Sequence, residues 1–264
     1  MHAHTVMLDG YRHRYYAVAV PDSPYPPVVG LHGFGLDSYR TFHTVADPLR
    51  KRGIALYALD LPGFGKSEAP ERLYSLRHYA ALLAAFAAAL DPPAPPVLLG
   101  HSMGGKIAAA GAVLHPDTFA GLLLINPGGF SWMAPWIPVL ASTRGANALL
   151  RRPWVRKHVL ARLPLGRLIA RPAQAEQALR LRRSHYALDL DATGLRARLG
   201  AIARPVGILW GHRDAYLPAG TLDRIRDQIP QALVYRLPRA GHFPMWTAPE
   251  AFADVVYRFV QRIA

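Results

Sequence analysis

Apolar runs recur along the chain, and each ends at a turn marked by glycine, proline or histidine. Because these runs lack polar alternation, they predict strands that are buried on both faces, as in a parallel sheet covered by helices. An alternating stretch at 12–20 precedes them and predicts one further strand. The apolar runs cover residues 27–33, 54–63, 96–102, 121–129, 205–214 and 232–242.

Helix-compatible segments lie between most of these runs, so the chain predicts an α/β fold with a mostly parallel sheet and helices on both faces. In open sheets of this kind, ligands bind outside the carboxyl ends of the strands. The turns marked by glycine, proline or histidine lie at these ends. The predicted helices cover residues 38–52, 75–90, 103–114, 221–228 and 249–262.

One long segment interrupts the alternation of strands and helices. Residues 130–194 contain no convincing strand and include the run SWMAPWIP. We interpret this segment as a helical cap inserted over the strand ends. The predicted core therefore consists of residues 1–129 and 195–264, and the cap of residues 130–194.

Composition limits the chemistry and the location of the protein. The chain has 264 residues and no cysteine, which excludes disulfides and thiol catalysis. No apolar stretch reaches the roughly 20 residues that span a bilayer, and the amino terminus has no signal-peptide core. We expect a soluble, cytoplasmic protein. The twelve histidines are scattered without carboxylates at ligand spacing, so no metal or other cofactor is expected.

The net charge of +14 is concentrated in the predicted cap. Between Phe130 and His185 there are eleven Arg or Lys and a single acid, Glu176, so the rest of the chain carries only +4. Arginine accounts for 27 of the 31 basic residues, which fits codon bias, but bias does not explain the missing acids. The segment is a solvated face, a docking surface for an acidic partner or a membrane-interface element. Nucleic acid binding fits less well, because no aromatic residues interleave along a strand groove.

A serine among glycines is the strongest chemical signal. Ser102 lies in GHSMGG, directly after an apolar run and before the helix-compatible KIAAAGAVL. A nucleophile elbow needs this context: a tight strand-to-helix turn holds the serine in a strained backbone, and side chains at Gly100 and Gly104 would collide. The hydroxyl then projects at a helix amino terminus, which favours developing negative charge.

A nucleophilic serine needs a base and an acid that orients it. His242 follows the last predicted strand and precedes an amphipathic helix, so we favour it as the base over an ordinary turn histidine. Asp214 comes directly off the preceding strand in GILWGHRD and is the better acid than Asp223 or Asp227, which lie on the next helix. The order Ser, Asp, His agrees with this architecture.

An oxyanion hole needs two backbone donors. The N–H of Met103, directly after the serine, is one candidate. The N–H of Phe34 in the turn LHGFG is the other, since Gly33 and Gly35 give that turn the freedom to aim an amide inward.

Five motifs in order resemble those of the α/β-hydrolase fold family, over nearly the whole chain apart from the cap. The resemblance implies Ser102 as nucleophile, Asp214 as acid, His242 as base and the amides of Phe34 and Met103 as oxyanion donors. The motifs are HGFG (32–35), DLPGFGKS (60–67), GHSMGG (100–105), GHRDAYLP (211–218) and GHFPMWTAPEAF (241–252).

The resemblance also narrows the reaction. Dehalogenases and epoxide hydrolases of the family use an aspartate nucleophile, so Ser102 argues against both. Asp60 matches a recurring family position, which we interpret as holding its loop. We predict a carboxylic ester or thioester hydrolase with an acyl-serine intermediate. A carbon–carbon bond hydrolase is the first alternative, because Trp246 is similar to the carboxyl-terminal motif of those enzymes. A small-molecule receptor with slow turnover is the alternative of another class.

The predicted cap suggests the substrate. Its opening residues Trp132, Met133 and Trp136 are candidates for an apolar acyl pocket, although packing of the cap on the core explains them equally well. We hypothesise that the basic segment attracts anionic esters or an acidic acyl carrier protein. This is similar to one esterase of the family, whose basic cap meets an acidic carrier.

Overall fold

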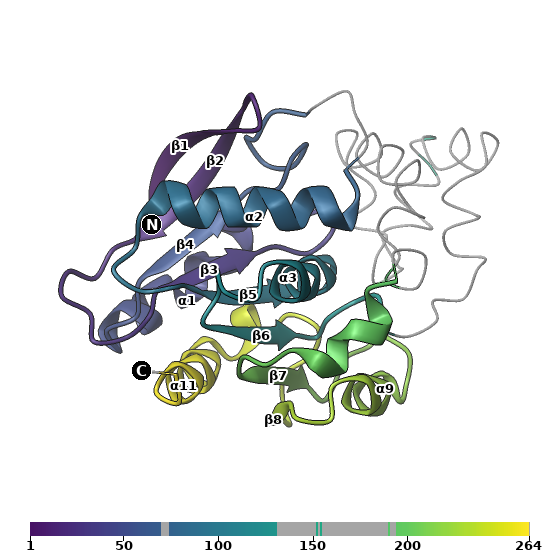
Figure 1. Ribbon diagram of the computed structural model, residues 1–264. Helices are drawn as coiled ribbons and strands as arrows, with labels where there is room; N and C mark the ends of the chain where they lie inside the picture. Colours follow the sequence, from purple (N-terminus) through teal and green to yellow (C-terminus); the bar gives the residue numbers. More distant parts are fainter. Residues whose placement is uncertain (70–73, 131–151, 153, 155–189, 191–193, 264) are drawn as a thin grey trace.

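The computed structural model describes residues 1–69, 74–130, 152, 154, 190 and 194–263. Their core is an eight-stranded sheet in the order β1-β2-β4-β3-β5-β6-β7-β8 (Figure 1). The strands are β1 (His2–Leu8), β2 (Tyr11–Val18), β3 (Val28–Leu31), β4 (Leu56–Leu59), β5 (Val97–His101), β6 (Gly121–Ile125), β7 (Val206–Gly211) and β8 (Leu233–Leu237).

The six strands from β3 to β8 pair in parallel, which confirms the predicted α/β class with a mostly parallel sheet. β1 and β2 form an antiparallel hairpin at one edge. The sequence analysis did not predict β1, whose residues are mostly exposed and lack a core-facing pattern. The hairpin turn at Asp9 and Gly10, with φ of 55° and 79°, has the left-handed backbone that two-residue hairpins prefer.

Helices cover both faces of this sheet (Figure 1). α1, α10 and α11 pack on one face, and α2, α3, α9 and the 3₁₀ helix η3 pack on the other. The five predicted helices are present, with ends within two residues of the prediction. The short α10 and η3 were not predicted. The bounds are α1 (Ser38–Lys51), α2 (Leu76–Leu90), α3 (Met103–Leu114), η3 (Arg196–Ala201), α9 (Thr221–Gln228), α10 (Pro244–Thr247) and α11 (Pro249–Val260).

Local chemistry sets where these helices begin. The Asp37 carboxylate accepts the N–H of Arg40 at 2.8 Å and caps α1. Ser75 and His78 form a reciprocal capping box at the start of α2. Pro249 opens α11 at a position where a helix needs no N–H donor. These caps explain why the predicted and observed starts agree.

Neighbouring residues of one strand enter opposite cores. In β5, Leu98 belongs to the cluster beneath α2 and α3, whereas Leu99 belongs to the cluster beneath α1 and α11. Both side chains are fully buried. Burial on both faces is the physical reason that the strand runs lack polar alternation.

The predicted cap falls mostly outside the described residues, and so do Trp132, Met133 and Trp136. Phe130 and Leu190, near its two ends, are buried in the cluster that also holds α3. Among the described helices, none is long and apolar enough to cross a membrane.

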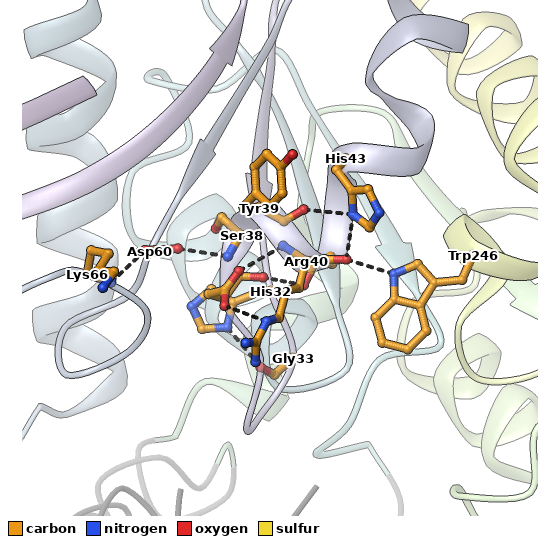
Figure 2. A network of polar contacts seen from close by, with 11 residues as sticks. His32, Gly33, Ser38, Tyr39, Arg40, His43, Asp60, Lys66 and Trp246 are labelled. Carbon is orange, nitrogen blue, oxygen red and sulfur yellow. Dashed lines mark hydrogen bonds and ion pairs between the residues drawn. The ribbon is translucent and has the colours of Figure 1, made fainter. Parts of the chain in front are cut away.

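Buried polar groups join the loops at the carboxyl ends of β3 and β4 (Figure 2). The Asp60 carboxylate accepts the N–H of Ser38 at 2.7 Å and of Lys66 at 2.9 Å, so it ties its own loop to the start of α1. The N–H of Leu61 donates to His32 Nε2 at 3.1 Å, and His32 Nδ1 lies 2.8 Å from the Gly33 carbonyl oxygen. His32 is therefore neutral, with its proton on Nδ1.

A second buried histidine joins the loops after β5 and β8. His101 Nε2 donates to the carbonyl oxygen of His242 at 2.8 Å. Burial lowers the pKa of His101 to about 3 and the pKa of His32 to about 4, and it raises the pKa of Asp60 to about 6. In all three groups burial shifts the pKa towards the neutral form, because the surrounding core solvates charge poorly.

We expect Leu98→Ala and Leu99→Ala each to lower the free energy of unfolding by about 2–5 kcal/mol, since both remove a fully buried side chain. Met7→Ala, at a side chain that is 60% exposed, should change it by less than about 0.5 kcal/mol. Urea unfolding measures all three. A nearly neutral effect at one of the two leucines would mean that the sheet is covered on one face only.

The buried titratable groups predict how stability depends on pH. Below the ordinary histidine pKa of 6.5, the unfolded chain binds protons that folded His101 and His32 do not, so stability falls as the pH falls from 6.5 towards 4. Asp60 acts in the opposite direction, because between pH 3.8 and about 6 its folded carboxyl holds a proton that the unfolded one has lost.

Equilibrium unfolding between pH 4 and 6.5 tests both signs. His101→Gln should make the acid loss of stability shallower by about 1.4 kcal/mol per pH unit, the value of one proton. Asp60→Asn should make it steeper. Three parallel curves for the wild type and the two variants would contradict the assignment.

Candidate active site

Ser102 lies between β5 and α3 with a backbone that side chains rarely adopt, at φ 52° and ψ −114°. Hydrogen bonds hold this turn. The Ser102 N–H donates to the Ile125 carbonyl at 3.0 Å, and the Ser102 carbonyl accepts the N–H groups of Gly105 and Gly128, both at 2.9 Å. The side chain is partly exposed at the amino terminus of α3, where the helix dipole favours negative charge.

Glycines around this turn allow a close approach of backbone to backbone. A Cβ on Gly100 would lie 2.5 Å from the Gly104 oxygen, and a Cβ on Gly104 would lie 2.5 Å from the Leu31 oxygen. A Cβ on Gly33 would lie 3.2 Å from Ser102 Cβ. The loop after β3 therefore packs directly against the predicted nucleophile, and the geometry is that of a nucleophile elbow.

Asp214 and His242 are in contact, as the sequence predicts. His242 Nδ1 lies 2.7 Å from Asp214 Oδ2, and their side chains are only 6% and 2% exposed. The two loops meet because Gly211 at the end of β7 approaches the Gly241 carbonyl so closely that a side chain would not fit. The N–H of Arg213 also donates to the Ala240 carbonyl at 2.9 Å.

The Asp214 carboxylate is surrounded by hydrogen-bond donors. Burial alone would raise its pKa, but the hydrogen bond with His242 and those from the amides of Tyr216 and Leu217 outweigh burial, so the pKa lies below its ordinary value. The carboxylate is therefore ionised at neutral pH and can orient the imidazole and stabilise its positive form.

Ser102 lies next to this pair through its neighbour His101, whose ring centroid is 4.9 Å from that of His242. Within the described part of the chain, no hydrogen bond joins Ser102 Oγ to His242 Nε2. Such bonds are often long before substrate binds. The three predicted residues follow β5, β7 and β8, whose carboxyl ends lie on the same side of the parallel sheet.

The two predicted oxyanion donors also lie beside Ser102. The Met103 N–H is in the first turn of α3, where a helix supplies no acceptor. The Phe34 N–H belongs to the same peptide unit as the Gly33 carbonyl that His32 binds. Because the N–H and C=O of a trans peptide point in opposite directions, the His32 contact sets the direction of the Phe34 N–H. The sequence analysis did not identify this role of His32.

Aromatic rings pack around His242. Tyr216 stacks on His242 with centroids 4.9 Å apart, and Phe243 meets His242 edge to face at 5.0 Å. Trp246 stacks on Phe243 at 4.4 Å, and its indole N–H donates to the Arg40 carbonyl at 2.9 Å (Figure 2). Its described contacts join α10 to α1 and do not include the predicted triad residues, so they give this tryptophan a packing role.

Asn126, directly after β6, is a further residue that contacts the site. Its Nδ2 donates to Asp214 Oδ2 at 2.6 Å. The sequence analysis assigned this asparagine no role. No local pattern marks an asparagine that pairs with a residue 88 positions away. Among the described residues, no group of three metal-binding side chains converges.

Comparison with known proteins agrees with this architecture. The chain is similar to the solved structure of a membrane phospholipase A, which is described as a bacterial virulence factor. The TM-score is 0.74 at 28% sequence identity, and the match covers 99% of this chain and 86% of that one. A pimeloyl-[acyl-carrier protein] methyl ester esterase from Chromobacterium violaceum is 30% identical over 86% of this chain and 91% of its own length.

A third relative has a different named activity. It is a 2-hydroxy-6-oxononadienedioate/2-hydroxy-6-oxononatrienedioate hydrolase from Cupriavidus pinatubonensis, 28% identical over 88% of this chain and 86% of its own length. A profile of the alpha/beta hydrolase family matches residues 28–255, from the start of β3 into α11. The strand order and the turn at Ser102 agree with this match. The chain therefore belongs to the alpha/beta hydrolase family and is a hydrolase.

Proposed function

We propose that this hydrolase cleaves carboxylic esters or thioesters through an acyl intermediate on Ser102. The observation that carries the proposal is the strained Ser102 turn at the start of α3, beside a buried His242 whose Nδ1 is bonded to an ionised Asp214. A serine hydroxyl is a weak nucleophile by itself, and a neighbouring oriented imidazole is the usual means of activating it.

The proposed reaction has two halves. His242 Nε2 takes the Ser102 proton as Oγ attacks the carbonyl carbon, and the amides of Phe34 and Met103 stabilise the oxyanion. The intermediate collapses, and the leaving alcohol or thiol takes the proton from His242. Water then attacks the acyl-serine, with its proton passing to His242 and from there to Ser102 Oγ. Asp214 stays ionised throughout and keeps the imidazole in the required orientation.

We further propose that the substrate is an anionic ester or an acyl group on an acidic carrier protein. Two observations support this class. The segment between Phe130 and His185 contains eleven basic residues and one acid. The relative at 30% identity is named as an esterase of an acyl-carrier-protein methyl ester. Opposite charge accelerates encounter between such partners.

Carbon–carbon bond hydrolysis is the second candidate, and the 28% identical hydrolase of an oxononadienedioate favours it. Turnover of that dienedioate would identify this reaction. A receptor function would instead give a single slow event and a thermal shift with ligand. Many turnovers per minute on simple esters exclude a receptor.

We expect the wild type to hydrolyse members of a p-nitrophenyl ester series from acetate to palmitate. Ser102→Ala and His242→Ala should each remove nearly all turnover, and the double variant should be no worse, because triad members act as a unit. Asp214→Asn should lower kcat on the order of 10⁴-fold, by analogy with serine proteases. Initial rates measure each, and undiminished turnover by Ser102→Ala would sink the proposal.

Reversing the charges of Arg151, Arg152 and Arg156 to Glu should lower kcat/KM for an anionic or carrier-bound ester severalfold at low salt, with little effect on a neutral ester. High salt should lower the wild-type value similarly, because salt screens exposed charges. The matched control reverses Arg50, Arg258 and Arg262, which are exposed near the carboxyl ends of α1 and α11. Equal losses in both triple variants, or no salt dependence, would contradict the role of the basic segment.

A further inference from the structure

Every acceptor position of the Asp214 carboxylate is occupied. Oδ1 accepts the N–H groups of Tyr216 at 2.8 Å and Leu217 at 3.0 Å. Oδ2 accepts Nδ2 of Asn126 at 2.6 Å and Nδ1 of His242 at 2.7 Å. Asn126 therefore binds the same oxygen that orients the proposed base.

The direction of the Asn126 amide follows from its second contact. The N–H of Gly211 can only donate, and it lies 3.0 Å from the Asn126 side-chain oxygen. The other amide atom must then be the nitrogen, and it points at Asp214. The N–H groups of Tyr216 and Leu217 are fixed donors too. A proton on Asp214 would therefore compete with a donor at either oxygen, which favours the ionised, acceptor-only carboxylate.

An acceptor-only carboxylate has a consequence for His242. Its Nδ1 must carry a proton to donate to Asp214, so Nε2 of the neutral ring has a free lone pair, as a general base requires. We propose that Asn126 is a positioning residue that holds Asp214 as an ionised acceptor and thereby fixes the catalytic tautomer of His242. This inference rests on the proposed serine-hydrolase function.

The backbone of Asn126 supports a specific role. Its φ of 39° is in the left-handed region, where asparagine is tolerated far better than most side chains. Two residues close to it in the chain contact the proposed nucleophile: the Ile125 carbonyl accepts the Ser102 N–H, and the Gly128 N–H donates to the Ser102 carbonyl. The short loop 125–128 thus contacts both the proposed nucleophile and the proposed acid.

Two variants separate the amide from the backbone. Asn126→Gly keeps the left-handed conformation but removes the donor. It should lower kcat roughly 10- to 100-fold, the equivalent of losing a hydrogen bond to a charged group, with KM little changed. The melting temperature should also fall, because the buried Gly211 N–H loses its acceptor. Asp91→Gly is the matched control, because Asp91 also has a left-handed φ, of 44°, at the end of α2 and should leave kcat unchanged.

Asn126→Asp tests the positioning role through the pH dependence of kcat, which would not change if Asn126 had only a structural role. At a separation near 2.6 Å the introduced carboxyl and Asp214 should share one proton, so the introduced group donates to Asp214 and kcat stays near the wild-type value. When the pair loses that proton at higher pH, repulsion should displace Asp214 and kcat should fall. The variant therefore gains an alkaline limb in its pH profile that the wild type lacks. The other ionisable side chains at the end of β5 and in the loops after β7 and β8 are His101, His212, Arg213, Tyr216, Arg239 and His242, and all of them remain in the variant.

The downfield proton resonance of His242 Nδ1–H gives a second measurement that does not depend on turnover. It should be present in the wild type and in Asn126→Asp at low pH, and weakened or shifted in Asn126→Gly. A wild-type resonance, kcat and pH profile in both Asn126 variants would overturn the inference. Ser102→Ala in the same assay separates the two failures: if it retains turnover, the proposed function is wrong, and if it is inactive, only the role of Asn126 is wrong.

Discussion

The backbone contact between the first turn of α3 and the end of β3 is the constraint on which the site depends. Gly104 lies so close to the Leu31 carbonyl that a Cβ there would be 2.5 Å away. This contact sets the height of Ser102 above the sheet and brings the loop after β3 to its side. The strands that precede the site loops are parallel neighbours: β3, β5, β6, β7 and β8. Their carboxyl ends therefore lie on the same side of the sheet, and the loops that carry the other site residues begin there.

Two of the five described non-glycine residues with positive φ belong to this site. Ser102 and Asn126 both have positive φ, and they follow the adjacent strands β5 and β6. Conformations of this kind cost about 1–3 kcal/mol each and persist only where the surroundings over-determine them. Here the surroundings are specific hydrogen bonds. Ser102 is bonded on both its N–H and its carbonyl, and Asn126 is held by Leu209 and Gly211 from β7. The sheet therefore stabilises two turns that would not be stable alone.

The sequence predicts those features whose signals are local. The elbow can be predicted because Gly100, Ser102 and Gly104 lie within five residues. The helices can be predicted because their caps and apolar periodicity act over one or two turns. β1 escaped prediction because an exposed edge strand has no core-facing pattern. The roles of His32 and Asn126 were not predicted, because their hydrogen-bond partners, Leu61 and Asp214, are 29 and 88 residues away in the sequence. Only the folded sheet brings such pairs together.

In the function we propose, the chemical step and the choice of substrate depend on different parts of the chain. The groups around Ser102 are buried, and His32 and His101 are neutral, so their interactions are short, directional and insensitive to salt. Most of the net charge lies instead between Phe130 and His185. Exposed charges act over a Debye length of about 8 Å at physiological salt, which influences encounter rather than bond cleavage. If the proposal is correct, the core can keep one reaction while substitutions in the basic segment change the rate at which charged substrates reach it.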